Sequence, residues 1–115
     1  MTRIASIHYL LGSKKESLND ICKENPEWNY EKLFSKTGIN NRHILEDNET
    51  PEDLSFKASK VCIENYNNKE IDGIVYVTQS PTNPLPTRAC LLQDKLGITK
   101  NSLAFDINQG CSGFV

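Results

Sequence analysis

The chain has 115 residues, of which 37% are hydrophobic and 24% are charged, and its formal net charge is −2. This length suits one ordinary domain, and the composition is that of a globular rather than a disordered protein. The near balance of charge argues against nucleic acid as a main partner, the first residues lack the apolar core of a signal peptide, and no stretch approaches a membrane span. We therefore expect a cytoplasmic protein that binds neither nucleic acid nor membrane.

The first part of the chain predicts a strand followed by two short helices. Residues 3–11 carry several large apolar side chains before a Gly-Ser turn, a pattern typical of an opening strand. Ser17 has the features of a helix N-cap with an acid in the third helical position, and Pro26 marks the end of that helix. A second helix ends at Gly38, which suits a left-handed cap.

The middle of the chain predicts a loop, a longer helix and a buried strand. Residues 39–48 are polar and are expected to form an exposed loop. Thr50 is followed by a proline and two acids, which is typical of the start of a helix, here about three turns long. Residues 71–78 form a nearly continuous apolar run, which suits a strand covered on both faces and therefore a parallel sheet.

The last part of the chain predicts a shaped loop, a helix and a strand. Three prolines exclude helix and central strand from residues 79–87, at the C-terminal end of the strand before them. A helix that includes residues 91–96 ends at Gly97, and residues 103–107 form the next strand. This alternation predicts an α/β fold with right-handed crossovers, whose functional residues gather at the C-terminal ends of the strands.

Three of the four cysteines are expected to be structural. They are widely spaced and form no Cys-x-x-Cys pair, which argues against a zinc site, a thioredoxin-type motif and a disulfide framework. No metal site is therefore expected. Cys22, Cys62 and Cys90 each fall on the apolar stripe of a candidate helix, where a cysteine behaves as a small buried hydrophobe.

The fourth cysteine, Cys111, stands in a small-residue turn between Gly110 and Gly113. Glycine tolerates the backbone angles of a sharp strand-to-helix turn, and such a turn holds a thiol out of the sheet. The helix that follows favours the thiolate form, which makes Cys111 a candidate catalytic nucleophile. The alternative is a buried structural cysteine in a tight turn.

The chain stops at Val115, in the first turn of an element that its own core needs. We therefore expect residues 1–115 to be the incomplete N-terminal part of a larger protein, with the C-terminal half absent.

Four stretches, in order and at matching spacing, resemble segments of one enzyme family. They are residues 36–42 (KTGINNR), similar to R-T-G-I-x-x-R; 71–78 (IDGIVYVT), similar to I-D-x-I-x-x-x-T; 93–97 (QDKLG), similar to Q-x-x-L-G; and 105–114 (FDINQGCSGF), similar to the nucleophile turn. The chain thus resembles the N-terminal part of a β-ketoacyl-acyl-carrier-protein synthase III, a thiolase-fold condensing enzyme. The resemblance implies an α/β fold with a mixed sheet and flanking helices, and a homodimer in the full-length enzyme.

The activity implied by the resemblance is a Claisen condensation in two steps that starts fatty acid or related biosynthesis. The thiolate of Cys111 would attack an acyl-CoA and carry the acyl group as a thioester. Decarboxylation of malonyl-acyl carrier protein would then supply the carbanion that attacks this group. The family completes its site with a His and an Asn from the second half of the chain, and neither His8 nor His43 matches them. Acyl-CoA and acyl carrier protein are therefore the expected partners, with no cofactor.

The resemblance also implies residues that bind substrate. The arginine that begins the family's R-T-G-I segment is replaced by Lys36 in this chain. Four positions before that arginine, the family commonly has an aromatic residue that stacks on the CoA adenine, and this chain has Lys32 there. Trp28, one helical turn upstream, either supplies the ring or packs in the core or at the interface. Arg42 matches a second family arginine and either meets phosphate or is a solvated loop residue. Leu85 occupies the slot of a residue that walls the acyl pocket of the dimer partner, which suggests an acyl chain other than acetyl.

Other interpretations stay open. The chain can be part of a specialised thiolase-fold acyltransferase with a different acceptor, or an inactive fragment that only folds and self-associates. A third alternative is thiol redox sensing by Cys111.

Overall fold

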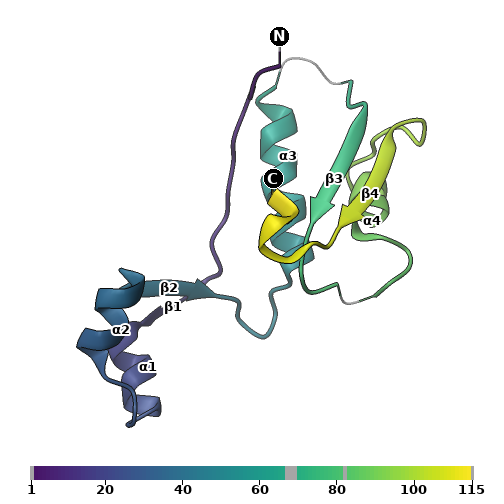
Figure 1. Cartoon of the computed structure of the whole chain (residues 1–115). Coiled ribbons are helices and arrows are strands. Elements are labelled where there is room, and N and C mark those ends of the chain that lie inside the picture. Colours follow the sequence, from purple (N-terminus) through teal and green to yellow (C-terminus); the bar gives the residue numbers. More distant parts are fainter. Residues whose placement is uncertain (1, 67–69, 82, 115) are drawn as a thin grey trace. The chain divides into compact units, whose positions relative to one another are not determined.

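The computed structural model describes residues 2–66, 70–81 and 83–114. In chain order, its elements are β1 (Lys14–Ser17), α1 (Leu18–Glu24), α2 (Tyr30–Thr37), β2 (Asn41–Ile44), α3 (Pro51–Glu64), β3 (Gly73–Val77), α4 (Arg88–Lys95), β4 (Leu103–Ile107) and the 3-10 helix η1 (Gly110–Phe114) (Figure 1). They divide into two compact units, one formed by residues 9–54 and the other by the described residues before and after that range. None of the helices in the described segments is both long and apolar enough to cross a lipid bilayer.

The unit of residues 9–54 is built on a short antiparallel pair of strands. β1 and β2 pair so that Lys14 lies opposite Ile44 and Ser17 opposite Asn41. Ser17 ends the strand and caps α1: its hydroxyl accepts from the backbone N–H of Asp20 at 3.1 Å and donates to that residue's carboxylate at 2.6 Å. The predicted capping box is therefore confirmed.

The second helix of this unit also follows its sequence signals. The side chain of Asn29 accepts from the backbone N–H of Lys32 at 2.9 Å and caps the start of α2. Gly38 ends the helix with a φ of 66°, the left-handed cap that the sequence predicts. On one side of α2 the rings of Tyr30 and Phe34 stack with their centroids 6.0 Å apart.

Two predictions for the first half of the chain are wrong. Residues 3–11 form no strand, because their backbone has no ladder partner among the described residues, and their large apolar side chains are exposed. Residues 39–48 are not wholly loop, because β2 runs through them and places His43 opposite Lys15.

Gly12 lies just before this pairing begins, where the two backbones come close together. A Cβ at Gly12 would collide with the carbonyl of Ile44 and lie 2.9 Å from the nitrogen of Leu45.

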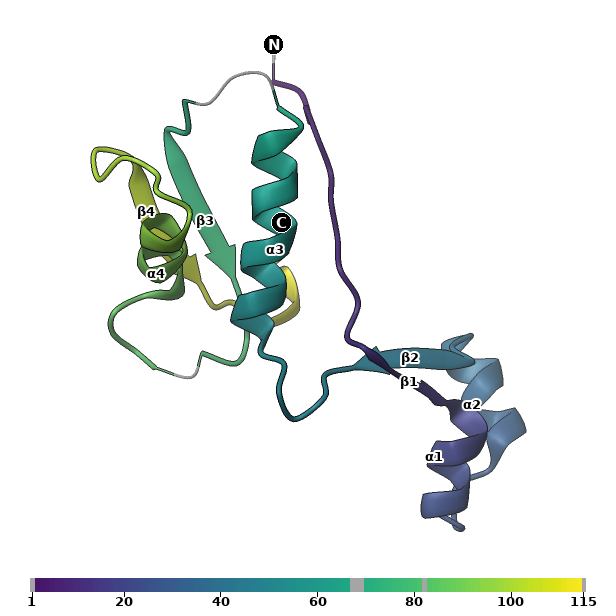
Figure 2. The same ribbon diagram turned by 180° about the vertical axis from the view of Figure 1, so that it is seen from behind.

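The other unit is built on a parallel pair of strands, as predicted. β3 and β4 pair from Gly73 opposite Leu103 to Val77 opposite Ile107, and α4 connects them in sequence. α4 lies beside β4 in both views of the ribbon (Figures 1 and 2). Of the described apolar residues in this unit, Ala89 and Leu92 of α4 are the buried ones, so the small core lies where this helix packs on the sheet.

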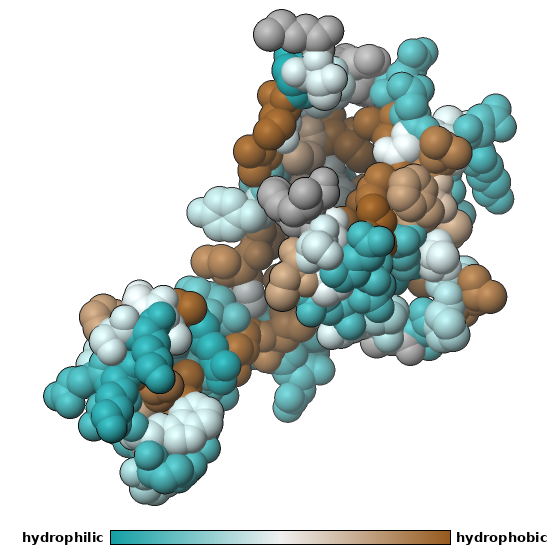
Figure 3. All heavy atoms as spheres, in the orientation of Figure 1, coloured by the Kyte–Doolittle hydropathy of each residue, from teal (hydrophilic) through white to brown (hydrophobic). Residues whose placement is uncertain are grey.

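The expectation that the strand within residues 71–78 is covered on both faces is wrong for the described residues. The side chains of alternate residues form an apolar face that stays about half exposed or more: Val75 (51%), Val77 (48%), Leu103 (69%) and Phe105 (44%). Brown apolar side chains accordingly gather over β3 and β4 in the space-filling view (Figure 3). We call these four residues the open sheet face.

Candidate active site

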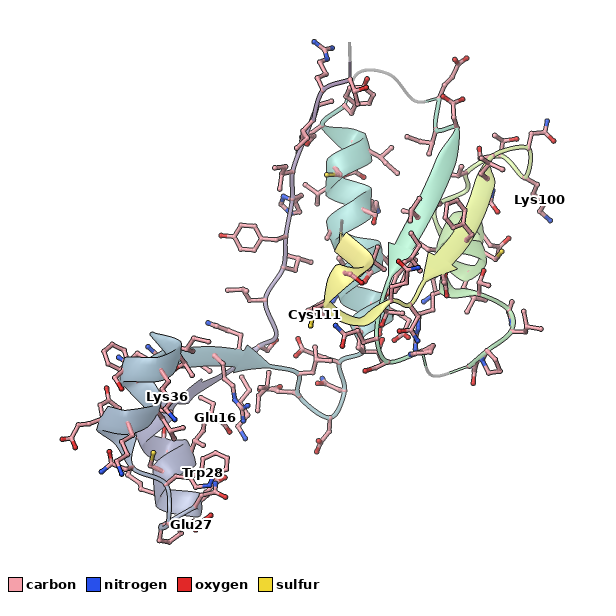
Figure 4. The ribbon with its side chains drawn as sticks, viewed as in Figure 1. Glu16, Glu27, Trp28, Lys36, Lys100 and Cys111 are labelled. Carbon is pink, nitrogen blue, oxygen red and sulfur yellow. The ribbon has the colours of Figure 1, made fainter. Side chains whose placement is uncertain are left out.

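Cys111 lies in a sharp turn immediately after β4, as the sequence predicts (Figure 4). The chain leaves the strand at Ile107 and reverses at Gly110, whose φ of 58° lies in the left-handed region. η1 begins at that glycine, and Cys111 is its second residue. Within this chain the thiol is free and its residue is exposed, which is the environment that a reactive cysteine needs.

The turn is held against the ends of both parallel strands. A Cβ on Gly113 would lie 3.0 Å from a methyl group of Val77 and 3.7 Å from one of Ile107, which are the last residues of β3 and β4. The hydroxyl of Ser112 donates to the carbonyl of Gln109 at 2.8 Å and closes the turn on itself. Cys111 is thereby displayed at the carboxyl edge of the parallel pair, where α/β sheets place their reactive groups.

The proline loop, residues 78–87, follows the carboxyl end of β3 at the same edge of the sheet. Its described residues form neither helix nor strand, as predicted, and the peptide bond between Leu85 and Pro86 is cis. Leu85 is 78% exposed, so within this chain its side chain packs on little. Thr87 ends the loop and caps α4.

The cysteines other than Cys111 are less buried than expected. Cys22 and Cys62 are half-buried, whereas Cys90 is exposed. Cys90 lies on α4 with its sulfur 3.9 Å from the carbonyl oxygen of Ala104. The prediction of a buried Cys90 is wrong for this chain, because Cys90 lies at the edge of the contact between α4 and β4, whereas Ala89 and Leu92 lie within the buried part of that helix.

The residues expected to bind substrate lie in the unit of residues 9–54, apart from Leu85. A hollow of about 330 Å³ is lined by both Trp28 and Arg42, together with apolar side chains that include Ile21 and Leu33. Trp28 follows α1 and is 48% exposed, so its ring is not fully packed in a core. Lys36 is exposed in the last turn of α2 and does not line the hollow (Figure 4).

Arg42 is already engaged by an acid. Its Nε and Nη2 atoms both lie 2.5 Å from the carboxylate of Glu16, on the facing strand of the ladder. The Glu16 side chain is only 12% exposed, whereas the Arg42 side chain is 57% exposed. An anion that approaches Arg42 therefore meets a guanidinium whose charge is largely balanced by Glu16.

Neither histidine lies in the Cys111 turn. His43 lies in β2, where its Nδ1 is 2.9 Å from the carbonyl oxygen of Gly12, and His8 is exposed. Within residues 2–66, 70–81 and 83–114, no group of three His, Cys, Asp or Glu side chains is placed to hold a metal ion.

Two charged residues near the turn were missed from the sequence. Arg88, the first residue of α4, is 5% exposed, and the carboxylate of Asp106 in β4 accepts two backbone N–H groups at the start of that helix. The available signal was Asp106 itself, because an acid within the apolar run of residues 103–107 needs a partner.

No model of a known protein family matches the chain. The chain is 41% identical over 104 residues to the β-ketoacyl-[acyl-carrier-protein] synthase III of Ehrlichia canis (strain Jake), a match that covers 89% of this chain and 32% of that protein. It is 40% identical over 104 residues to the synthase of the same name from Clostridium perfringens (strain SM101 / Type A), with 89% and 30% covered. The chain thus spans about a third of the length of these curated relatives.

The fold has solved counterparts as well. A crystal structure of a 3-oxoacyl-(acyl-carrier-protein) synthase III matches with a TM-score of 0.83 and 35% identity, over 96% of this chain and 34% of that one. The synthase III of Thermus thermophilus matches with a TM-score of 0.84 over 97% of this chain and 35% of that one, and at 23% identity it supports the fold alone. The predicted α/β, thiolase-like fold class is confirmed.

Proposed function

Because the chain resembles part of a β-ketoacyl-[acyl-carrier-protein] synthase III in both sequence and fold, we propose that it is the N-terminal part of a condensing enzyme of this kind. The observation that carries the proposal is the exposed Cys111 in a glycine turn at the carboxyl edge of a parallel pair of strands. The rest of the enzyme supplies the His and Asn that complete the site.

The proposed reaction has two steps. In the first, the thiolate of Cys111 attacks the thioester carbonyl of an acyl-CoA, a new carbon–sulfur bond forms, and CoA leaves as the thiolate. In the second, malonyl-acyl carrier protein loses carbon dioxide, and the resulting carbanion attacks the acyl-enzyme carbonyl and expels the thiolate of Cys111. Each step exchanges bonds without net oxidation, so the substrates themselves suffice and no cofactor is needed.

In this chain, the backbone around Cys111 has the task of stabilising developing negative charge. Backbone N–H groups in the turn would face the carbonyl oxygen as it becomes an oxyanion, which is the kind of contribution that lowers the barrier in acyl transfer. Apart from its two chain neighbours, Gly110 has no described atom within 4 Å of its Cβ position, which leaves room for the acyl group.

Substrate binding is proposed at Trp28, Lys36 and Arg42, in the unit of residues 9–54, and at Leu85 in the proline loop. The ring of Trp28 and the guanidinium of Arg42 border one hollow, which suits the adenine and phosphate ends of CoA. For Arg42 to bind phosphate, the anion must compete with Glu16. Lys36 contributes a mobile point charge rather than the planar fork of an arginine. Leu85, exposed on its loop, is proposed to wall the acyl pocket of a second subunit in a cytoplasmic homodimer.

The test is covalent labelling of the complete enzyme with radiolabelled acyl-CoA. We expect label on the wild type, no label on Cys111→Ala and full label on Cys90→Ala. Cys90 is the matched control because it is also exposed and lies in the same unit. Absence of label on the wild type, or its loss in Cys90→Ala but not in Cys111→Ala, would overturn the proposal.

A second measurement separates the alternatives that involve the acceptor. Release of a β-ketoacyl product only when malonyl-acyl carrier protein is added supports the condensing reaction. Label on Cys111 that transfers to another acceptor instead would indicate a specialised acyltransferase. The 115-residue chain alone is expected to label weakly, because it lacks the proposed His and Asn.

A further inference from the structure

Asp106 joins the strand of Cys111 to the end of the proline loop. One carboxylate oxygen accepts the backbone N–H of Arg88 at 2.9 Å, and the other accepts that of Ala89 at 2.8 Å. Arg88 and Ala89 are the first two residues of α4, directly after the loop that carries Leu85. Asp106 itself lies in β4, on the stretch of chain that continues into the Cys111 turn.

These bonds are a structural tie rather than part of an anion site. The N–H groups of the first residues of a helix have no partner within the helix, and in α4 those of Arg88, Ala89 and Cys90 are all taken. Asp106 accepts the first two, and the side chain of Thr87 accepts that of Cys90 at 3.4 Å. A carboxylate is well matched to this position because the helix dipole also favours negative charge there.

Arg88 ties the other end of the same loop. Its side chain is buried, and the Nη2 atom donates to the carbonyl of Ser80 at 3.4 Å. The backbone N–H of Ser80 in turn donates to the hydroxyl of Thr78 at 3.1 Å, just past the end of β3. Asp106 therefore holds the backbone of Arg88 at the end of the loop, and the side chain of Arg88 holds Ser80 at the beginning of the loop.

We infer that Asp106 is a positioning residue that sets acyl-chain selectivity, by fixing the proline loop with Leu85 relative to the strand that carries Cys111. This role rests on the proposed function, in which Leu85 walls an acyl pocket. Asp106 and Arg88 act together: the carboxylate fixes the backbone at the end of the loop, and the guanidinium carries that constraint to the beginning of the loop.

The variants that test this role are Asp106→Asn and Arg88→Met. Asparagine keeps the size of Asp106 but replaces one acceptor oxygen by an NH2 group, which opposes a backbone N–H. Methionine keeps the apolar stem of Arg88 and removes the bond to Ser80. The control is Gln93→Ala, because Gln93 holds the other end of α4, where its amide donates to the carbonyls of Thr99 at 2.9 Å and Ser102 at 3.1 Å.

Two readouts are measured on the complete enzyme. Amide hydrogen exchange at Arg88 and Ala89 is expected to be about tenfold faster in Asp106→Asn, because a protecting hydrogen bond is lost. The ratio of kcat/KM for acetyl-CoA to that for a four-carbon acyl-CoA is expected to change several-fold in Asp106→Asn and in Arg88→Met. Gln93→Ala is expected to destabilise α4 and leave this ratio unchanged.

The result that would overturn the inference is an unchanged acyl-chain ratio in Asp106→Asn despite the faster exchange. An equal change of the ratio in Gln93→Ala would also overturn it, since general loosening of α4 would then explain the effect. Failure of the proposed function is recognised separately: the wild type would form no acyl-enzyme, while exchange at Arg88 and Ala89 would still report the tie by Asp106.

Discussion

Replacing Gly110 by alanine tests whether the backbone of the turn, rather than the cysteine alone, makes the site reactive. The φ of this glycine is 58°, and apart from its two chain neighbours no described atom lies within 4 Å of its Cβ position. The methyl group therefore meets no obstacle, and the cost is that of the left-handed backbone, about 1–2 kcal/mol for a residue with a side chain. Gly38 is a matched control: its φ is 66°, its Cβ position is equally open, and it lies in the other unit.

The two substitutions are expected to have the same effect on stability and different effects on chemistry. In the complete enzyme each should lower the free energy of unfolding by about 1–2 kcal/mol. The strained alanine at position 110 can relax into another backbone conformation that is favoured over the reactive turn by the same energy of about 1–2 kcal/mol. Because fewer molecules then hold the reactive turn, acylation of Cys111 slows by about 5- to 30-fold. Gly38→Ala should acylate at the wild-type rate.

The assay is rapid-quench labelling with acyl-CoA, paired with denaturant unfolding of the same samples. Gly110→Asn adds an internal check, because asparagine tolerates the left-handed region better than alanine and should slow acylation less. Equal acylation rates in Gly110→Ala and Gly38→Ala, at equal loss of stability, would refute the idea that the left-handed turn sets the reactivity of Cys111.

Two further predictions concern charges in the unit of residues 9–54. Glu16→Gln should tighten CoA binding by about two- to fivefold, because Arg42 loses its partially exposed ion-pair partner. The Kd is measured by calorimetry on the complete enzyme, and an unchanged Kd would argue against a phosphate role for Arg42. The hydrogen bond from Ser17, with a further contribution from Lys23, lowers the pKa of Asp20 below its ordinary value of 3.8. Ionised Asp20 thus stabilises α1 above pH 3.8, and this contribution is lost as the pH falls through the lowered pKa. In Ser17→Ala the carboxyl resonance of Asp20 should titrate closer to 3.8, and an unshifted midpoint would contradict the assignment of the cause.

Local signals in the sequence predicted most of the elements. The caps at Ser17 and Gly38 and the proline after Thr50 each mark a helix end that needs only neighbouring residues to form. The apolar run of residues 71–78 predicted β3 and its parallel pairing. The turn at Cys111 followed from its glycines in the same way.

The features that the sequence did not reveal depend on partners far along the chain. Residues 3–11 have the composition of a strand, but a strand exists only where a second backbone pairs with it, and none of the described residues does so. β2 lies in a polar stretch because β1 supplies that pairing. The bonds from Asp106 to the start of α4 and from Glu16 to Arg42 likewise join residues that only the folded chain brings together.

The open sheet face has a consequence for how such a protein is made in the cell. Parallel strands pair slowly, so Val75, Val77, Leu103 and Phe105 of β3 and β4 stay exposed during folding for as long as no other segment covers them. Apolar surface of this kind attracts other nascent chains and is what chaperones bind. A polar substitution such as Val75→Thr should therefore improve the yield of the isolated chain while weakening the assembly of a longer one.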